Sequence, residues 1–254
     1  MLLSLILLAL PLPSIAFIEI QGRLYLSAVI KGGTEARQHS RPYMAAIRSS
    51  DNQIIWKHCG GFLVREDFVL TAAHCYGRNM IVTLGAHNIK TNEPTQQVIP
   101  VLQAIPHPEY NDDTYVNDIM LLKLNHTAQL NTAVQIIALP QSQDFIRPDK
   151  VCSVAGWGVT DNGWVSATLR EVDLEVQNKE QCEQTFYYFH DSIQLCVGNP
   201  LYPKEAGKGD SGGPLVCDNV AQGIVSLGVY TSSIGVYTRI SSFVPWIHRI
   251  MNAL

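Results

Sequence analysis

The sequence predicts an all-β protein, a sandwich or a barrel, with one helix at the C-terminus. Short runs rich in β-forming residues recur along the chain and are separated by turn residues. No helical pattern alternates with them, so a sheet wound with crossover helices is not expected. At 254 residues, 46% of them hydrophobic, the chain can bury a large core, and all-β proteins of this size often fold as one unit.

The first element, residues 1–16, is expected to be a signal peptide. Residues 1–10 are almost entirely apolar, prolines follow at positions 11 and 13, and the small residues of 14–16 fit a signal-peptidase site. A membrane anchor is the alternative, but the apolar run is far shorter than the roughly 20 residues of a spanning helix. We therefore expect a secreted protein without a membrane span.

The strands are expected where β-rich runs lie between turn residues. These runs span residues 61–64, 68–71, 81–84, 120–124, 151–155, 169–176, 214–216, 224–227 and 236–240. A helix is expected over residues 242–251, where Ser242 can cap the N-terminus and Pro245 falls in the first turn. Its apolar residues recur at helical spacing, so this helix should pack on the body of the protein.

The charge of the chain argues against nucleic-acid and anionic-membrane partners. Only 16% of the residues are charged, and the formal net charge is −4. Surfaces that bind polyanions need an excess of basic side chains. We therefore expect no nucleic acid among the partners of this protein.

The cysteines are expected to form disulfides, because a secreted chain meets an oxidising compartment. The chain has six cysteines, and the residues alone do not choose their pairing. A zinc site at His58-Cys59 and His74-Cys75 is the competing interpretation, but no compact four-ligand spacing is present. We expect neither a metal nor a cofactor. The sequon that begins at Asn125 is expected to carry an N-linked glycan.

The segment Gly-Asp-Ser-Gly-Gly-Pro at 209–214 is the strongest sign of chemistry in the chain. A serine between glycines can be held in a tight, exposed turn whose N–H groups point outward, which would combine a nucleophile with an oxyanion site. Such a serine needs a base to remove its proton. Thr-Ala-Ala-His-Cys at 71–75 offers His74, and Asn-Asp-Ile-Met-Leu-Leu at 117–122 offers Asp118. An ordinary turn serine and a strand-end aspartate are the alternatives.

These three motifs closely resemble those of the chymotrypsin-family (trypsin-like) serine proteases. The resemblance runs from about residue 30 to the C-terminus and includes Gly-Trp-Gly at 156–158 and Gly-Val-Tyr-Thr at 235–238. The order His, Asp, Ser also matches this branch of the triad enzymes. The resemblance implies two six-stranded antiparallel β-barrels with a C-terminal α-helix, and a catalytic cleft between the barrels.

The resemblance also implies a role for each residue of the site. Ser211 would be the nucleophile, His74 the general base and acid, and Asp118 the group that fixes the tautomer of His74. The N–H groups of Gly209 and Ser211 would form the oxyanion hole. Ser226 would be a partner of Asp118 and an edge on which the substrate backbone pairs. The implied disulfides are Cys59–Cys75, Cys152–Cys217 and Cys182–Cys196.

In this family the carboxylate beside the serine, here Asp210, pairs with an α-amino group that cleavage releases. Ile30 resembles that new N-terminus, so residues 17–29 would be a pro-segment and residues 30–254 the protease domain. Trypsinogen-like chains carry Arg or Lys before the cut, whereas this chain has Ala28-Val29. An unusual peptidase is therefore expected to trim it.

Trypsin and chymotrypsin carry a cysteine two residues before the oxyanion glycine, paired with one on the opposite wall of the pocket. This chain has Gly207 at the first position and no cysteine in 229–235. In this it resembles the granule group of granzymes, mast-cell chymases and cathepsin G. We therefore expect secretion or storage in granules, and a monomer that acts on protein or peptide substrates and meets serpin-type inhibitors. The primary pocket would be lined by Glu205, Ala206, Ser226, Gly228 and Gly235. Two preferences stay open for the substrate residue that precedes the cleaved bond. It would be basic if the Glu205 carboxylate points into the pocket, and large and apolar if it does not.

A catalytically inactive relative that acts as a binding or antimicrobial protein is the alternative function. Such relatives usually lose the histidine or the serine, and this chain keeps both. A non-proteolytic acyl hydrolase is disfavoured as well, because the nucleophile-elbow pattern and its Ser, Asp, His order are absent. A serine endopeptidase is therefore the function that the sequence predicts.

Overall fold

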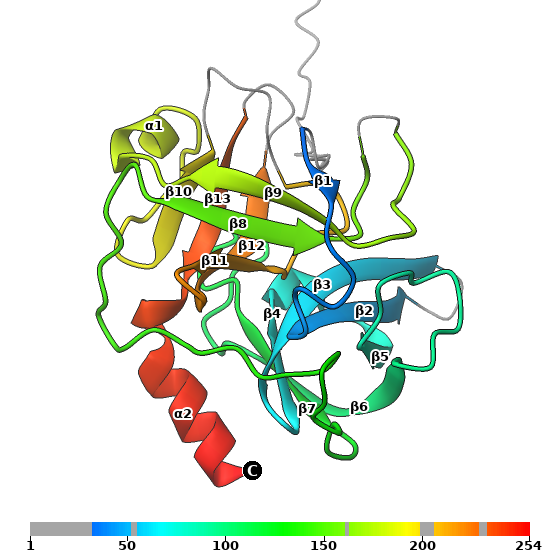
Figure 1. The fold of residues 1–254 in the computed structure, drawn as a ribbon. Coiled ribbons are helices and arrows are strands. Elements are labelled where there is room, and N and C mark those ends of the chain that lie inside the picture. Colours follow the sequence, from blue (N-terminus) through cyan, green and yellow to red (C-terminus); the bar gives the residue numbers. More distant parts are fainter. Residues whose placement is uncertain (1–31, 52–54, 161–162, 199–205, 229–232) are drawn as a thin grey trace, which may run out of the picture.

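The computed structural model describes residues 32–51, 55–160, 163–198, 206–228 and 233–254 (Figure 1). The expected signal peptide and pro-segment lie outside these residues. So do two of the expected site residues, Ile30 and Glu205.

The first half of the chain forms a closed antiparallel barrel of six strands in the order β2-β3-β4-β7-β6-β5. The strands are β2 (Met44–Asp51), β3 (Ile55–Arg65), β4 (Phe68–Thr71), β5 (Arg78–Leu84), β6 (Gln97–Pro106) and β7 (Met120–Leu124). Closure leaves no sheet edge to be covered, which suits a chain with this many short strands.

The second half forms an antiparallel sheet of seven strands in the order β1-β9-β8-β11-β12-β13-β10. The strands are β1 (Thr34–Glu35), β8 (Val151–Gly156), β9 (Arg170–Glu175), β10 (Gln194–Gly198), β11 (Pro214–Cys217), β12 (Val220–Gly228) and β13 (Ile234–Arg239). An isolated bridge between Val176 and Val197 joins the end of β9 to β10, so the six longer strands curve into a barrel. The short β1 is added to the edge of β9.

Two short helices and two 3₁₀ turns complete the described part of the chain. They are η1 (Ala73–Cys75), α1 (Lys179–Glu183), η2 (Ile240–Ser242) and α2 (Val244–Ala253). The two antiparallel β-barrels and the C-terminal helix confirm the predicted fold.

The prediction that Ser242 caps the C-terminal helix is wrong. A 3₁₀ turn intervenes after β13, so the helix begins two residues later, with Phe243 at its N-cap. The hydroxyl of Ser242 donates instead to the carbonyl of Ser192 at 2.7 Å. Pro245 does lie in the first turn, as expected.

Helix α2 ties the C-terminus of the chain to the first barrel. Trp246 and Ile247 are buried in the same apolar cluster as Phe68 and Leu121. The ring of His107, at the end of β6, lies 5.2 Å from that of Trp246. This packing fixes the two halves of the molecule relative to each other.

The two barrels also meet through polar contacts. Arg41, just before β2, donates to Ser153 on β8 at 2.8 Å and to Glu171 on β9 at 3.1 Å. The N–H of Gly60 on β3 donates to the carbonyl of Ser211 at 2.7 Å. The segment that carries Ser211 is therefore held directly against the first barrel.

Candidate active site

His74 lies in the 3₁₀ turn η1, directly after β4. Thr71, the last residue of β4, anchors this turn by donating its hydroxyl to the carbonyl of Gly60 at 2.8 Å. On the other side of His74, Cys75 is bonded to Cys59 on β3. A short turn held at both ends gives the imidazole a fixed position.

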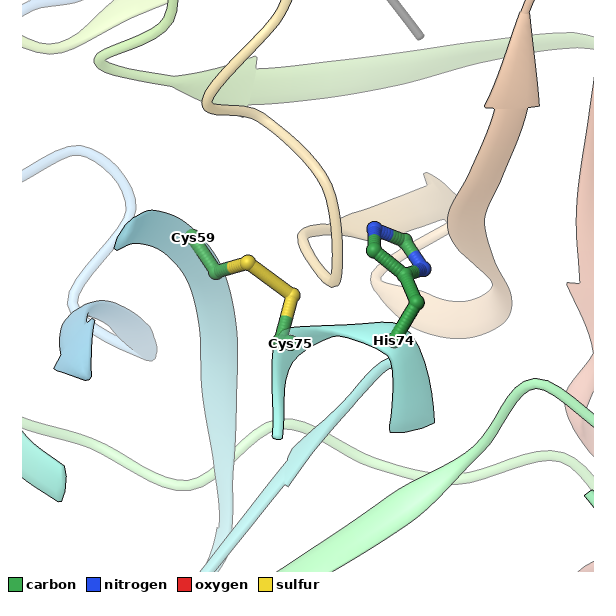
Figure 2. A group of neighbouring side chains, drawn as sticks. All are labelled: Cys59, His74 and Cys75. Carbon is green, nitrogen blue, oxygen red and sulfur yellow. A yellow bond between two sulfur atoms is a disulfide. The ribbon is translucent and has the colours of Figure 1, made fainter. Parts of the chain in front are cut away.

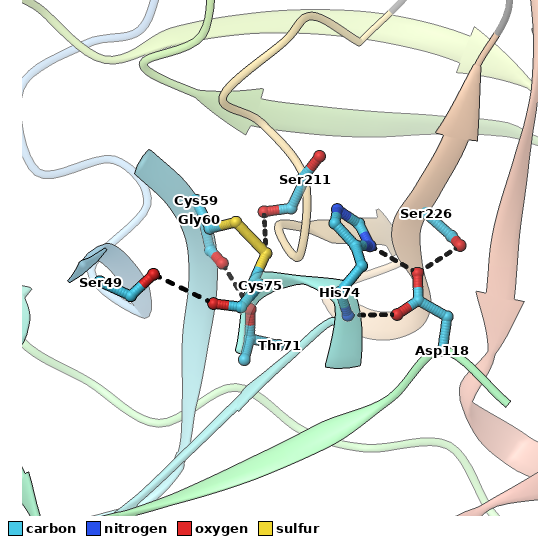
Figure 3. Close-up of a disulfide and its surroundings, with 9 residues drawn as sticks. All are labelled: Ser49, Cys59, Gly60, Thr71, His74, Cys75, Asp118, Ser211 and Ser226. Atoms are coloured by element: carbon cyan, nitrogen blue, oxygen red, sulfur yellow. Dashed lines mark hydrogen bonds and ion pairs between the residues drawn. A yellow bond between two sulfur atoms is a disulfide. The ribbon is translucent and has the colours of Figure 1, made fainter. Parts of the chain in front are cut away.

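Asp118 lies directly before β7 and is only 1% exposed. Its Oδ1 accepts the backbone N–H of His74 at 2.9 Å. Its Oδ2 lies 2.7 Å from Nδ1 of His74 and accepts the hydroxyl of Ser226 at 2.6 Å (Figure 3). The carboxylate therefore holds both the backbone and the ring of His74.

The surroundings keep Asp118 ionised. Burial alone would raise the pKa of this carboxyl, but the charge of His74 and the hydrogen bonds from His74 and Ser226 lower it below its usual value. An ionised Asp118 can only accept, so Nδ1 of His74 carries the proton that faces it. When the ring is neutral, Nε2 is therefore the nitrogen that can accept a proton from another group.

Ser211 lies in the loop before β11 and is partly exposed. Gly209 has φ +101° and Gly212 has φ +82°, conformations that side chains rarely adopt. The N–H of Gly212 donates to the carbonyl of Val225 on β12 at 2.8 Å. These contacts hold Ser211 at a sharp turn, as the run of glycines in the sequence predicts.

Within the described residues, Ser211 Oγ and His74 Nε2 do not form a hydrogen bond. Nε2 is buried and has no partner. Both residues nevertheless line one cavity, and Figure 3 shows the ring of His74 between Ser211 and Asp118. Catalytic hydrogen bonds are often long until substrate is bound, so this geometry is compatible with a nucleophile and its base.

The cavity has a volume of about 640 Å³ and lies between the two barrels. Residues from both barrels line it: Lys57, His58, Cys59, His74, Tyr115, Val159, Val165, Leu174, Val197, Ala206, Gly207, Lys208, Gly209, Ser211, Val225, Ser226, Leu227, Gly228, Ser233, Ile234, Gly235 and Tyr237. The expected pocket residues Ala206, Ser226, Gly228 and Gly235 are among them.

The N–H groups of Gly209 and Ser211 donate to no acceptor in the described part of the chain. Both residues line the cavity. Two unused N–H groups beside a serine hydroxyl can bind a carbonyl oxygen and stabilise the negative charge that develops on it.

Asp210 lies fully buried beside the serine, at 0% exposure. Its carboxylate accepts the N–H of Gly158 at 2.8 Å and that of Gly207 at 2.6 Å. Burial raises the pKa of Asp210 to about 7, although these two hydrogen bonds oppose the rise. No cation of the described residues pairs with it. A carboxyl in such a place calls for a positive partner.

The cysteines pair as the resemblance implies, with Cys59–Cys75, Cys152–Cys217 and Cys182–Cys196 all bonded. Figure 2 shows the first of these disulfides beside the ring of His74. A disulfide offers no thiolate, so these two cysteines and His74 do not make the zinc site considered from the sequence.

Tyr115 was not anticipated from the sequence. Its ring meets that of His74 edge-on, with centroids 5.5 Å apart, and its backbone has φ +57°. No motif surrounds Tyr115, so only the fold brings it into the cavity. Thr238 ends the Gly-Val-Tyr-Thr segment at 235–238, but the sequence assigned it no role in the site.

Two other expectations concern the surface of the protein. Asn125 is exposed in the bend after β7, where a glycan would find space. None of the helices in the described ranges is long and apolar enough to cross a membrane.

Comparisons with known proteins give the family. A family model described as Trypsin matches residues 30–247. Mast cell protease 8 of Mus musculus is 56% identical over 223 residues, which cover 87% of this chain and 90% of the relative. Granzyme B of Homo sapiens is 53% identical over 225 residues, which cover 87% of this chain and 91% of the relative.

A solved structure described as "Structure of GrC" has the same fold. It matches with a TM-score of 0.85 and 51% sequence identity, over 88% of this chain and 100% of that one. The family match and these relatives together span most of the chain. The chain therefore belongs to the trypsin family of serine proteases and is a serine endopeptidase.

Proposed function

We propose that this endopeptidase cleaves protein substrates through an acyl-enzyme formed on Ser211, with His74 and Asp118 as the other members of the triad. The observation that carries the proposal is the buried carboxylate of Asp118, 2.7 Å from Nδ1 of His74. This contact directs Nε2 toward the cavity that Ser211 lines.

In the proposed reaction, Ser211 Oγ attacks the carbonyl carbon of the peptide bond while its proton passes to His74 Nε2. The carbonyl oxygen becomes negative and is bound by the N–H groups of Gly209 and Ser211. His74 then gives the proton to the leaving amine, and the C–N bond breaks. A water molecule releases the acyl group by the same steps, with its proton passing through His74 back to Ser211.

Activation is proposed to begin with cleavage between Val29 and Ile30. The released α-ammonium group would be the positive partner that the buried Asp210 requires. Because Gly209 and Ser211 flank Asp210, the new ion pair would order the oxyanion site and bring Ser211 into hydrogen-bonding distance of His74. Residues 17–29 are then the pro-segment.

The primary pocket is proposed to lie in the part of the cavity lined by Ala206, Gly228 and Gly235, with Ser226 at its edge. The glycines leave room for a long side chain. Two preferences follow from the sequence, a basic residue held by Glu205 or a large apolar residue held by the walls. The first requires the Glu205 carboxylate to point into the pocket.

We also propose that residues 1–16 direct the chain to secretion or to secretory granules, and that Asn125 is glycosylated on the way. Serpin-type inhibitors would enter the same cavity as a substrate, and the chain would act as a monomer.

A fluorophosphonate probe, which labels an activated serine, tests the proposed function. A chain that starts at Ile30 should be labelled at Ser211, as mapped by mass spectrometry, whereas a chain that starts at Phe17 should be labelled far more slowly. The Ser211→Ala variant should remain unlabelled. A folded, correctly trimmed chain that takes up no label would favour the inactive, binding relative instead.

A further inference from the structure

Asp118 is held by a second contact that is independent of its side chain. Its backbone carbonyl accepts the hydroxyl of Thr238 at 2.7 Å. Thr238 lies on β13 in the second barrel and is 2% exposed, whereas Asp118 belongs to the first barrel. This hydrogen bond therefore crosses the interface between the barrels at the proposed triad.

The carbonyl of Asp118 needs such a partner because it lies outside the strand ladders. The pairing of β7 with β4 and β6 begins at Met120. Before it, the N–H of Ile119 donates to the carbonyl of Asn117 at 2.8 Å and closes a three-residue turn around Asp118. A buried carbonyl in such a turn would lack a partner without Thr238.

The turn that carries Asp118 depends on its surroundings. Asn117 has φ +58° and Tyr115 has φ +57°, a region that residues with side chains populate sparsely. Such a conformation persists only where surrounding contacts determine it. The sheet of the second barrel is the rigid neighbour here, since Thr238 pairs with Ile224 of β12 on one side and Gln194 of β10 on the other.

We infer that Thr238 is a positioning residue for the reaction and acts through Asp118. Ser226 holds the carboxylate and Thr238 holds the backbone, so two hydroxyls from the second barrel fix one residue of the first. The inference rests on the proposed role of Asp118. Loss of the Thr238 hydroxyl would shift the carboxylate of Asp118 relative to Nδ1 of His74. The imidazole ring of His74 would then change its position relative to Ser211.

The test uses chains that start at Ile30 and a peptide substrate. Thr238→Val keeps the shape of the side chain and removes the hydroxyl, whereas Thr238→Ser keeps the hydroxyl. We expect Thr238→Val to lower kcat by about 10- to 100-fold, because small displacements of a catalytic group are costly. KM should change by less than about twofold, since Thr238 does not line the cavity. Thr238→Ser should restore most of kcat.

Thr95→Val is the matched control. The Thr95 hydroxyl also donates to a backbone carbonyl, that of Gly85, at 2.8 Å, and Thr95 does not line the cavity. This variant loses the same kind of hydrogen bond and should keep the kcat of the parent chain. A fall in kcat that is equal in Thr95→Val and Thr238→Val would show a general loss of stability and overturn the inference.

A second readout does not depend on turnover. The proton between His74 Nδ1 and Asp118 should give a resonance at low field in the proton NMR spectrum. It should move in Thr238→Val and stay in place in Thr95→Val. An unmoved resonance with unchanged kcat would refute the inference. If Thr238→Val does not fold, Thr238→Ala takes its place with the same criteria. An inactive parent chain would refute the proposed function instead.

Discussion

Asp210 holds a carboxyl group in a fully buried position, where its contacts within the described residues are the N–H groups of Gly158 and Gly207. Both neighbouring glycines at 156 and 158 are needed, because a Cβ at either position would collide with this carboxylate. The chain therefore builds a close-fitting site around one carboxyl group. We propose that this site binds the α-ammonium group of Ile30 after cleavage.

The raised pKa of Asp210 makes the stability of the uncut chain depend on pH. Burial raises this pKa from 3.8 to about 7, so the folded chain keeps a proton that the unfolded chain releases above about pH 4. The contribution of Asp210 to the stability of the uncut chain should therefore be highest below about pH 4 and should fall as pH rises to about 7. For a shift of about three units the loss is roughly 4 kcal/mol at most.

Urea unfolding of the uncut chain between pH 4 and 7 measures this dependence, with Asp210→Asn as its control. The asparagine does not titrate, so the difference in stability between the two chains should change across this interval. A constant difference would mean that Asp210 is not buried as a protonated acid.

The residues of the proposed site differ in how well the sequence predicts them. His74, Asp118 and Ser211 stand in motifs whose residue types and order already indicate the chemistry. The structure adds the 2.7 Å contact between His74 and Asp118. Tyr115 stands in no such motif. Thr238 stands in the Gly-Val-Tyr-Thr segment at 235–238, but the motif alone gave it no role, and only the fold brings its hydroxyl to Asp118.

Among the elements, the strands made of β-forming residues and bounded by turns were predicted, and strands of other composition were not. β4 and β7 have the predicted bounds, Phe68–Thr71 and Met120–Leu124. β6 escaped prediction because much of it is exposed and prolines stand at positions 100 and 106, so no apolar alternation marks it. β10 is nearly as short as β4 and equally buried, so neither shows an alternation, but β10 has Gln194 and Gly198 at its ends where β4 has β-forming residues throughout.

The proposed primary pocket combines residues on described strands with Glu205, which lies outside the described residues. Strands β12 and β13 supply Gly228 and Gly235, which face the cavity. Glu205 precedes the described Ala206 and lies outside the described residues. The resemblance therefore predicted wall residues that lie on described strands, whereas the direction of the Glu205 side chain must be measured.

The substitution Glu205→Ser tests whether a charge selects the substrate. If the carboxylate enters the pocket, it attracts a bound Arg or Lys and disfavours apolar side chains. Cleavage after Arg or Lys should then fall strongly in Glu205→Ser, while cleavage after Phe, Tyr or Leu rises. The exposed Glu180 on α1 provides the control variant Glu180→Ser. An unchanged ratio of Arg to Phe cleavage would reject charge selection and leave a large apolar residue as the preference.

At the scale of the whole molecule, the site exists only where the two barrels meet. The first barrel contributes His74 and Asp118, and the second contributes Ser211, Ser226 and Thr238. The barrels are joined by helix α2, by Arg41 and by the hydrogen bond from Gly60 to Ser211. The sequence predicted two barrels through its resemblance to a family, while strand patterns alone left a sandwich or a barrel open.

We propose that Ser211 and His74 act as one unit in peptide cleavage. The most direct measurement is kcat/KM for four chains that start at Ile30: the parent, Ser211→Ala, His74→Ala and the double variant. Each single change should lower activity on the order of a million-fold, and the double variant should lose no more than either one. Losses that multiply, or peptidase activity retained without Ser211, would contradict this account.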